Sequence, residues 1–370
     1  MDTLDKIYIW FSMSELEIAS LYEILSLYDN TEDLFYIDKY NGKISYILSG
    51  QEFQKFIDIR DRELNRVINY LENGKINFVT LNSTEYPRCF RNLDYPPFVI
   101  YYRGDLSLLE KRSIAVLGSR VCTRYGKEQS ERFAEEFVKE GFVLVTGLTE
   151  GIETYAVTKG LNVGGKVICI MANGLKSVYP AENLFLAKRI FEEGGLLISE
   201  NYPDFKPIGM SFVQRNRLIP AVAEAILIVE AGAKSGSLYT VNFALDMGRD
   251  IFALPGNCNS SASAGSNDLI KRYYCACVTA PSEVIETLNT NYIENNNKSN
   301  INNKSEIELD LNLNPLEKTI YDFVKIEEKH FDEILEKTQI ETKKLLVVLT
   351  TMEIRGLIRK LPGNYFSKKD

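Results

Sequence analysis

The segment Gly118-Ser119-Arg120 has the residue types of a phosphate-binding turn. Four apolar residues lead into Gly118, and a helix is expected to begin near Gly126. A turn in this place exposes backbone N–H groups, and the positive end of a helix dipole beside it favours an anion. The guanidinium of Arg120 adds forked donors that fit phosphate oxygens. The same residues also suit a purely structural turn with an exposed arginine, and the motif alone does not separate the two.

A second basic segment, at 212–217, has the sequence FVQRNR and precedes a long apolar stretch. Its two arginines flank one asparagine, so both cations are expected near the carboxyl edge of a sheet, where phosphate would meet them. The alternative is that they pair with acidic neighbours such as Glu200 or Glu230. The candidate binding residues of this segment are Phe212, Arg215, Asn216 and Arg217.

A third segment follows the apolar run at 225–229. Its candidate residues are Lys234, Ser235, Gly236 and Ser237. Hydroxyl and N–H groups at a helix start, here expected near Leu238, favour an anion, although a serine there also serves as an ordinary helix cap. The carboxyl ends of parallel strands meet at one edge of a sheet, so we expect the three segments to converge there.

The composition of these turns argues against a nucleotide cofactor. A dinucleotide site needs small residues in its turn, and the chain contains neither G-x-G-x-x-G nor G-x-x-x-x-G-K-[ST]. Phosphate that belongs to a polymer fits better than NAD or ATP, so we expect no cofactor.

The only histidine of the sequence, His330, lies near the C-terminus, and the central part has no Ser-His-Asp or Cys-His arrangement. Glu150 and Glu153 offer paired carboxylates or simply complement a helix dipole, and we expect no catalytic residues.

The net charge of −8 hides an uneven distribution, because residues 111–135 hold six basic side chains against three acidic ones. A basic surface on the middle of the chain is therefore compatible with a nucleic-acid partner.

Cys275 and Cys277 lack a second Cys or His pair at zinc spacing, so we expect no metal. No apolar run has the length of a membrane span, and the acidic N-terminus lacks the order of a secretory signal. We expect a cytoplasmic protein without membrane contact.

The central part of the chain alternates between strand-like and helical segments. Strand-like runs lie at 114–117, 143–146, 166–170, 196–199, 225–229 and 251–254, with helical segments between them. Strands that are apolar on both faces and alternate with helices indicate a parallel sheet covered on both sides. We predict an α/β fold with an extended Rossmann-like, doubly wound, mostly parallel sheet that binds ligands at the carboxyl ends of its strands.

The flanking parts differ in composition. Residues 1–72 show helical periodicity and predict a small helical (SAM-like) domain, which precedes the Rossmann-like domain at 73–288. Residues 289–314 are rich in Asn and Ser and predict a flexible linker. Residues 315–370 contain three helical stretches and a Pro-Gly-Asn turn between strands, which is typical of a winged helix-turn-helix.

In their order along the chain, these segments resemble the DNA-processing protein A family (DprA, also called Smf). The resemblance covers nearly the whole chain and includes GSRVCTRYG, TGLTEGIE, NGLKSVYPAEN, FVQRNRLIPAVAEAILIVEAGAKSG, DIFALPGN and GSNDLI. It implies a homodimer that binds single-stranded DNA in a basic pocket, protects incoming DNA in natural transformation and loads a RecA-type recombinase. It also assigns DNA contact to the three segments described above.

The chain departs from the family pattern in the second turn, where Glu150 replaces an arginine and Val157 replaces a histidine. A carboxylate beside phosphate is unfavourable, so we expect weaker DNA binding or a different path of the strand. The usual Gly-Ala after GSNDLI is replaced by Arg272-Tyr273-Tyr274.

The leading hypothesis is a non-enzymatic DNA-binding protein that stacks bases on aromatic side chains such as Tyr125, Tyr179 or Phe212. The competing hypothesis is a Rossmann-type nucleoside-phosphate hydrolase, for which carboxylates are present but a glycine-rich GT loop is not. A third hypothesis makes the acidic N-terminal domain and the winged helix protein-docking modules, with DNA binding secondary.

Overall fold

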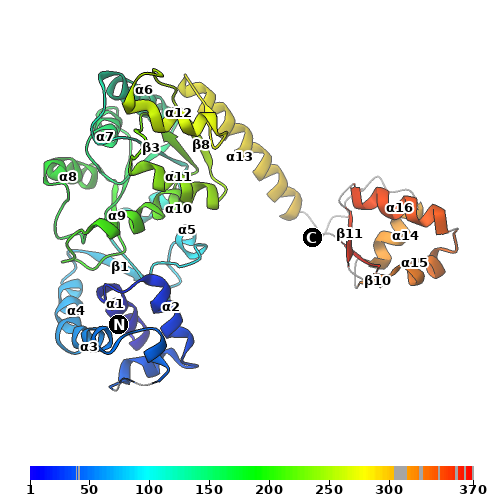
Figure 1. Ribbon diagram of the computed structural model, residues 1–370, viewed down its shortest axis with the longest axis horizontal. Helices are drawn as coiled ribbons and strands as arrows, with labels where there is room; N and C mark the ends of the chain where they lie inside the picture. Colours follow the sequence, from blue (N-terminus) through cyan, green and yellow to red (C-terminus); the bar gives the residue numbers. More distant parts are fainter. Residues whose placement is uncertain are drawn as a thin grey trace. The chain divides into compact units, whose positions relative to one another are not determined.

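The computed structural model describes residues 1–38, 40, 42–303, 315–324, 328–340, 342–354, 357–361 and 364–368 (Figure 1). They form two compact units, Met1–Tyr292 and Ile293–Asp370. Within these residues, no helix combines the length and the apolar character that crossing a bilayer requires. Nor does the described part of the chain contain a group of three or more His, Cys, Asp or Glu side chains that could hold a metal ion.

In the described part of the first unit, the sheet has nine strands in the order β1-β2-β6-β5-β4-β3-β7-β8-β9. The neighbours from β6 to β9 are parallel, whereas β1 with β2 and β2 with β6 are antiparallel. The strands are β1 (Asn77–Thr80), β2 (Val99–Gly104), β3 (Ser113–Leu117), β4 (Val143–Thr146), β5 (Val167–Ile170), β6 (Leu196–Ser199), β7 (Ala225–Ile228), β8 (Asp250–Ala253) and β9 (Ala276–Cys277). The six strands predicted for the centre of the chain are β3 to β8, and the mostly parallel Rossmann-like sheet is confirmed.

The central strands are apolar on both faces because both faces are covered. In β3, Ile114 and Val116 belong to one hydrophobic core, while Ala115 and Leu117 belong to another on the opposite face. Successive side chains of a strand point to opposite faces, so each core needs its own layer of helices. This requirement explains why the sequence alternates strands with helical segments.

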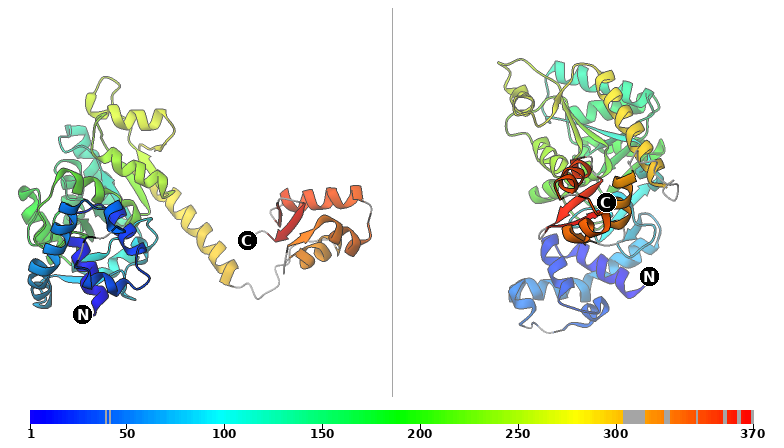
Figure 2. Two further views of the ribbon diagram at one scale, coloured as in Figure 1. Left: turned by 60° about the horizontal axis from the view of Figure 1, so that its bottom comes forward. Right: turned by 90° about the vertical axis from the view of Figure 1, so that its right-hand side faces the viewer.

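Two layers of helices supply these covers (Figure 2). The first core receives side chains from α6, α7, α8 and α13, and the second receives them from α5, α10, α11 and α12. The helices are α5 (Arg88–Arg91), α6 (Arg124–Lys139), α7 (Ile152–Asn162), α8 (Leu184–Glu192), α9 (Gly209–Asn216), α10 (Leu218–Val222), α11 (Ser237–Asp246), α12 (Ala264–Lys271) and α13 (Pro281–Asn303), with the short 3-10 turns η4 (Leu106–Glu110), η5 (Ala181–Asn183) and η6 (Ser261–Ser263).

Residues 1–72 are helical, as their periodicity predicts, but they share the first core with the sheet. Trp10 is fully buried and stacks on Phe56 at 3.9 Å between ring centroids, while Phe11 meets Phe98, just before β2, at 5.3 Å. The predicted boundary between residues 72 and 73 therefore does not separate two compact units. The elements of this part are α1 (Thr3–Met13), α2 (Ile18–Ser26), η1 (Thr31–Tyr36), η2 (Ile44–Tyr46), α3 (Gly50–Asp58), the π-helical turn η3 (Ile59–Glu63) and α4 (Leu64–Glu72).

The strand order reverses between β3 and β7. The chain passes from β3 through β4 and β5 to β6, and then returns to β7 on the other side of β3. The loops that leave β3 and β7 therefore diverge and open a crevice at the carboxyl ends of the strands. Doubly wound folds bind their ligands at such a switch point.

The second unit is a winged helix, as predicted. Its three strands, among the described residues, form a sheet in the order β10-β12-β11, and its helices enclose a separate hydrophobic core that includes Ile334, Leu345 and Phe366. The elements are α14 (Pro315–Val324), β10 (Lys329–His330), α15 (Phe331–Thr338), α16 (Thr342–Ile354), β11 (Ile358–Leu361) and β12 (Tyr365–Lys368).

The segment predicted to be a flexible linker, 289–314, begins as a helix. Residues 289–303 continue α13, and the role of the segment as a linker stays a prediction. The first turns of α13 are held in the core by Val284 and Leu288, and a helix that is already nucleated adds one hydrogen bond for each further residue. The rest of the predicted linker, 304–314, lies outside the described residues.

Candidate nucleic-acid interface

A hollow of about 560 Å³ lies at the switch point of the sheet. It is lined by the loops after β3, β4 and β7, by α9 and by the first residues of α11. Ten of the eleven residues that the sequence predicts for DNA contact line this hollow, and Arg217 is the exception. The three predicted segments thus converge on one site, while their contact with DNA stays a prediction.

The turn after β3 is organised by the buried Glu230, which follows β7. The Glu230 carbonyl accepts a hydrogen bond from the backbone N–H of Ser119 at 2.7 Å, and its carboxylate accepts from the N–H and hydroxyl of Thr123 at 2.8 and 2.9 Å. A Cβ atom on Gly126 would lie 2.6 Å from this carboxylate, so a larger residue there would displace the carboxylate from Thr123. The N-terminus of α6 therefore already holds an internal anion. It does not offer the open phosphate site that the sequence predicts.

The loop after β4 is organised in the same way by Glu153. One carboxylate oxygen accepts from the Thr146 hydroxyl at 2.8 Å and from the Gly147 N–H at 2.7 Å, and the other accepts from the Thr149 hydroxyl at 2.6 Å. Glu153 is 5% exposed although it lines the hollow. Its carboxylate therefore shapes the loop and is engaged on both oxygens.

Arg215 is a structural arginine rather than an open cation. It is 3% exposed, and its guanidinium donates to the carbonyls of Gly147, at 2.7 Å, and Ile170. Burial lowers the pKa of this guanidinium, and the nearby Glu153 opposes the change. The arginine joins α9 to the ends of β4 and β5. It offers little accessible surface to a phosphate, and its contact with DNA stays a prediction.

Arg217 faces away from the hollow and pairs with Glu200 at 2.5 Å; the two side chains are 13% and 14% exposed. This is one of the acidic partners that the sequence offered as the alternative, whereas the other, Glu230, binds Thr123. Arg217 lies beside a cavity between α9 and the N-terminal helices. The prediction that it joins the convergent site is wrong because an acidic partner binds its guanidinium on another side of α9.

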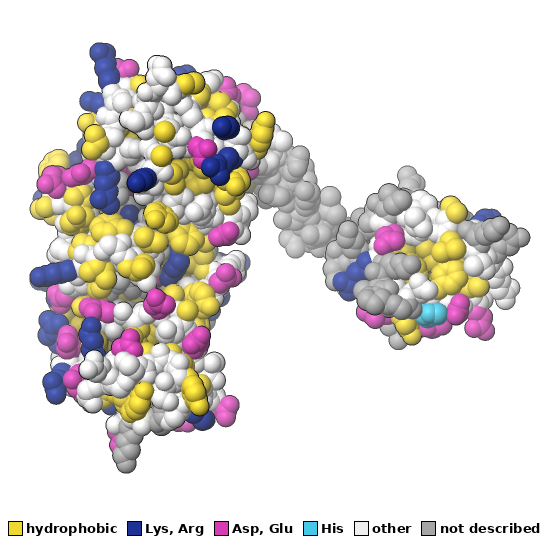
Figure 3. Space-filling model, in the orientation of Figure 1, with side chains coloured by type: hydrophobic (Ala, Val, Ile, Leu, Met, Phe, Trp, Pro, Cys, Tyr) yellow, Lys and Arg dark blue, Asp and Glu magenta, His cyan; other side chains and the backbone are white. Residues whose placement is uncertain are grey.

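Two cations of the hollow stay accessible. Arg120 and Lys234 are exposed, and neither forms an ion pair within the part of the chain that the structure describes. The Arg120 guanidinium lies over the Phe212 ring, 5.4 Å from its centroid. On the face drawn in Figure 3, Lys and Arg side chains of the first unit are interspersed with hydrophobic and acidic ones instead of forming one broad basic patch. Arg120 and Lys234 are the exposed cations in the lining of the hollow, and anion binding there depends on such well-placed groups.

The start of α11 supplies a further group of this kind. The helix begins at Ser237, and Gly236 at its N-cap position provides no side-chain hydrogen bond. The hydroxyls of Ser235 and Ser237 lie 2.8 Å apart and bond to each other, while the Asn216 amide donates to the Gly236 carbonyl at 3.3 Å. The serines are therefore not the ordinary caps of the alternative interpretation. An uncapped helix N-terminus beside Lys234 favours an anion in the hollow.

Residues 77–289 match the family described as DNA recombination-mediator protein A, and residues 308–364 match the DprA winged helix domain. The chain belongs to the DNA recombination-mediator protein A family. Protein Smf of Escherichia coli, a relative, is 29% identical over 357 residues, which are 93% of each chain. DNA processing protein DprA of Streptococcus pneumoniae is 36% identical over 218 residues, which are 59% of this chain and 75% of the relative.

Two solved structures of this family resemble the chain. DprA from Streptococcus pneumoniae gives a TM-score of 0.64 at 28% identity, covering 77% of this chain and 98% of its own. DNA processing protein A from Helicobacter pylori, described for its unique single-stranded DNA binding mode, gives 0.53 at 31% identity, covering 58% and 97%. The family resemblance found in the sequence is confirmed, and the relatives are DNA-processing proteins.

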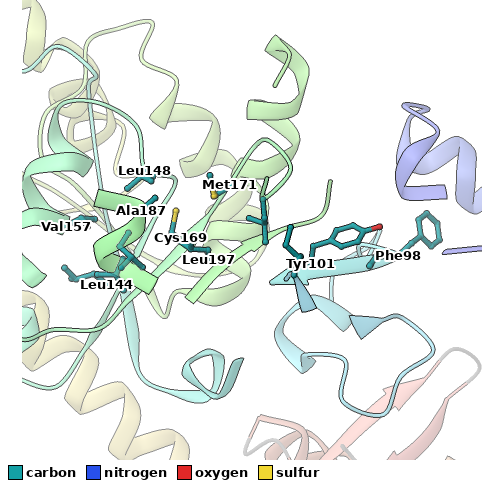
Figure 4. Close-up of a cluster of buried hydrophobic side chains, with 14 of the residues drawn as sticks. Phe98, Tyr101, Leu144, Leu148, Val157, Cys169, Met171, Ala187 and Leu197 are labelled. Atoms are coloured by element: carbon teal, nitrogen blue, oxygen red, sulfur yellow. The ribbon is translucent and has the colours of Figure 1, made fainter. Parts of the chain in front are cut away.

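The two residues that depart from the family pattern, Val157 and Glu150, lie in different environments in the structure. Val157 is 1% exposed and lies in the first core with Leu144 and Leu148 (Figure 4). It does not reach the hollow, so it has no direct effect on DNA contact. Glu150 is exposed and lines a small extension of the hollow beside Arg120.

Sequence reasoning missed the organising roles of Glu230 and Glu153. The sequence offers Glu230 as a partner for arginines, and Glu153 as one of two paired carboxylates or as a complement to a helix dipole. A usable signal was present for Glu230, because a single acidic residue ends the otherwise apolar run ILIVE. A buried charge at such a position requires partners, and N–H groups of a neighbouring turn are the nearest donors.

Proposed function

We propose that this protein binds single-stranded DNA in the hollow at the switch point, through phosphate contacts and without catalysing a reaction. The observation that carries the proposal is the meeting of two exposed cations, Arg120 and Lys234, with the uncapped N-terminus of α11 in one hollow. Cations and N–H groups bind phosphate in any sequence context. The similarity to the Helicobacter pylori protein supports the choice of a single strand.

The side chains and N–H groups of the hollow have different roles in binding a strand. Lys234 and the N–H groups at the start of α11 receive one phosphate, and Arg120 receives a neighbouring one. Arg215, Asn216 and Glu153 hold the loops in place from beneath. Aromatic rings at the rim offer stacking surfaces for bases. Of the three rings considered, Tyr179 and Phe212 lie at this rim, whereas the Tyr125 hydroxyl donates to the Pro255 carbonyl outside the hollow.

Family membership supports a wider role. We propose that the protein acts as a homodimer in the cytoplasm, protects incoming single-stranded DNA during natural transformation and transfers it to a RecA-type recombinase. Residues 77–289 match a family described as DNA recombination-mediator protein A, and this description supports the transfer step. Its test is the rate at which a recombinase assembles on a single strand already covered by a single-strand-binding protein. Acceleration by this protein supports the transfer, and an unchanged rate contradicts it.

The competing hypothesis of a nucleoside-phosphate hydrolase has less support. It requires a carboxylate that is free to act on bound substrate. Glu153, the carboxylate inside the main hollow, is engaged on both oxygens by Thr146, Gly147 and Thr149. The exposed Glu150 lines only the small extension at the rim, and the sequence lacks the glycine-rich GT loop that such an enzyme needs. Release of free base from nucleoside monophosphates would restore this hypothesis.

The direct test of DNA binding is fluorescence anisotropy with a labelled thymidine oligonucleotide of roughly 16 nucleotides, the upper end of a common site size. The same measurement with a duplex of equal length is the control. We expect tighter binding of the single strand and an affinity that falls as salt increases, by about 0.7 in log K per unit of log salt for each neutralised phosphate. Preference for the duplex, or affinity independent of salt, would contradict the proposal.

A further inference from the structure

A second, smaller hollow of about 40 Å³ continues from the rim of the main one. The two share Arg120, Thr149 and Phe212 in their linings. The remaining lining residues of the small hollow are Glu150, Tyr179 and Pro180. A strand whose phosphates lie on Arg120 can therefore place a base at this small hollow.

The small hollow combines an aromatic surface with a carboxylate. Tyr179 is 47% exposed and meets Phe212 edge to face, with 5.5 Å between the ring centroids. Arg120 covers another part of the Phe212 ring, which fixes the ring between the cation and the tyrosine. The exposed ring of Tyr179 offers a stacking surface to a base, because every base has a π-face.

Glu150 gives this surface a chemical preference. Its side chain is exposed, and it forms no ion pair within the residues that the structure describes. An ionised carboxylate only accepts hydrogen bonds. Phosphate next to it is repelled, whereas a neighbouring N–H donor is attracted. The group that Glu150 accommodates on a bound strand is therefore the donor edge of a base and not its phosphate.

We propose that the small hollow is a base-reading subsite that selects guanine, with Glu150 as the specificity-determining residue. The inference rests on the proposed function, because the subsite is reached only by a strand held in the main hollow. Guanine stacks on Tyr179, and its N1–H and N2–H groups donate side by side to the two Glu150 oxygens. The small volume admits the edge of the base while the ring stays stacked outside.

The other bases match the carboxylate less well. Thymine has one N3–H donor between two carbonyl oxygens, which face the negative charge. Adenine and cytosine each present one amino group beside a ring nitrogen that accepts. Guanine alone among the four presents two adjacent donors on the edge that a single strand leaves open, so it alone pairs with both oxygens. A bidentate contact of this kind discriminates by about tenfold when it is partly exposed to water.

The experiment compares three oligonucleotides of equal length. One contains thymidine alone. In the second, single guanosines are separated by thymidines, so that the strand does not self-associate. A third oligonucleotide carries inosine in place of guanosine and lacks only the N2 amino group. Affinities are measured for the wild-type protein, for Glu150→Gln and for Glu182→Gln. Glu182 is a matched control, since it is an exposed glutamate two residues after Pro180 that does not line either hollow.

We expect the wild-type protein to bind the guanosine oligonucleotide about tenfold more tightly than the thymidine and inosine ones. Glu150→Gln should abolish this preference, and Glu182→Gln should retain it. Equal affinity for all three oligonucleotides, or a Glu150→Gln variant that binds all three more tightly by the same factor, would overturn the inference and leave DNA binding intact. Failure of the wild-type protein to bind any of them would instead overturn the proposed function, and this inference with it.

Discussion

Replacing Arg120 with alanine tests the proposed function most directly. Arg120 is exposed, lines the hollow and has no acidic partner among the described residues, so its removal leaves no buried charge unpaired. The fold should therefore survive, and the change in DNA binding reports the phosphate contact alone. Arg124→Ala is the matched control. Arg124 is also an exposed arginine, but it pairs with Glu128 at 2.6 Å and does not line the hollow.

The size of the effect follows from the charges in the hollow. With Arg120 and Lys234 as the two accessible cations, the wild-type slope of log K against log salt is about −1.4, because each neutralised phosphate of a single strand contributes about −0.7. Arg120→Ala should reduce the slope to about −0.7. At about 0.1 M salt the lost contribution is about 0.7 log unit, which is about fivefold in affinity or about 1 kcal/mol.

The assay is fluorescence anisotropy on a labelled thymidine oligonucleotide over a salt series from about 0.05 M to about 0.2 M. The loss should be the same for other oligonucleotides that lack guanosine, since phosphate contacts carry no base information. Two results would refute this reasoning. One is an unchanged slope for Arg120→Ala, and the other is an equal reduction for Arg124→Ala.

Three further predictions concern other parts of the structure. Lys234→Ala should reduce the slope of log K against log salt by about 0.7. Its combination with Arg120→Ala should bring this slope close to zero. A slope that stays steep in the double variant would show that other cations hold the strand. Arg217→Ala leaves Glu200 without its buried partner and should lower the free energy of unfolding by about 3 kcal/mol in urea titration, with unchanged oligonucleotide affinity; weakened binding with full stability would contradict the assignment. Burial raises the pKa of the Cys169 thiol from 9.0 to about 12. A thiol reagent at about pH 8 should therefore leave Cys169 unlabelled and label the exposed Cys258. Mass spectrometry of the labelled peptides measures both outcomes. Because the folded state keeps the Cys169 thiol protonated, its contribution to stability is present below pH 9.0 and is lost as the pH rises towards about 12.

The sequence by itself predicted the parts of the fold that depend on local pattern. Apolar runs separated by helical segments identified β3 to β8, since a strand buried on both faces must be apolar throughout. Two polar segments follow such runs and a third precedes a long apolar stretch, and these positions also predicted their convergence, because parallel strands place their carboxyl ends on one edge. The order of motifs identified the family. None of these predictions required knowledge of which side chains touch.

The tertiary structure alone decided which charged groups are available. Arg120, Arg215 and Arg217 are the same residue type, and the sequence predicts the same DNA contact for all three. In the structure, Arg120 is exposed, Arg215 donates to backbone carbonyls and Arg217 pairs with Glu200. Glu230 lies 107 residues from Thr123 in the chain, and it reaches the start of α6 only because β7 pairs with β3. The free energy of a charge depends on the partners and the water within a few ångströms of it, and those neighbours come from distant parts of the chain. Residue types and their order therefore determine where the hollow forms, and the packing of the strands determines which of its cations can bind a ligand.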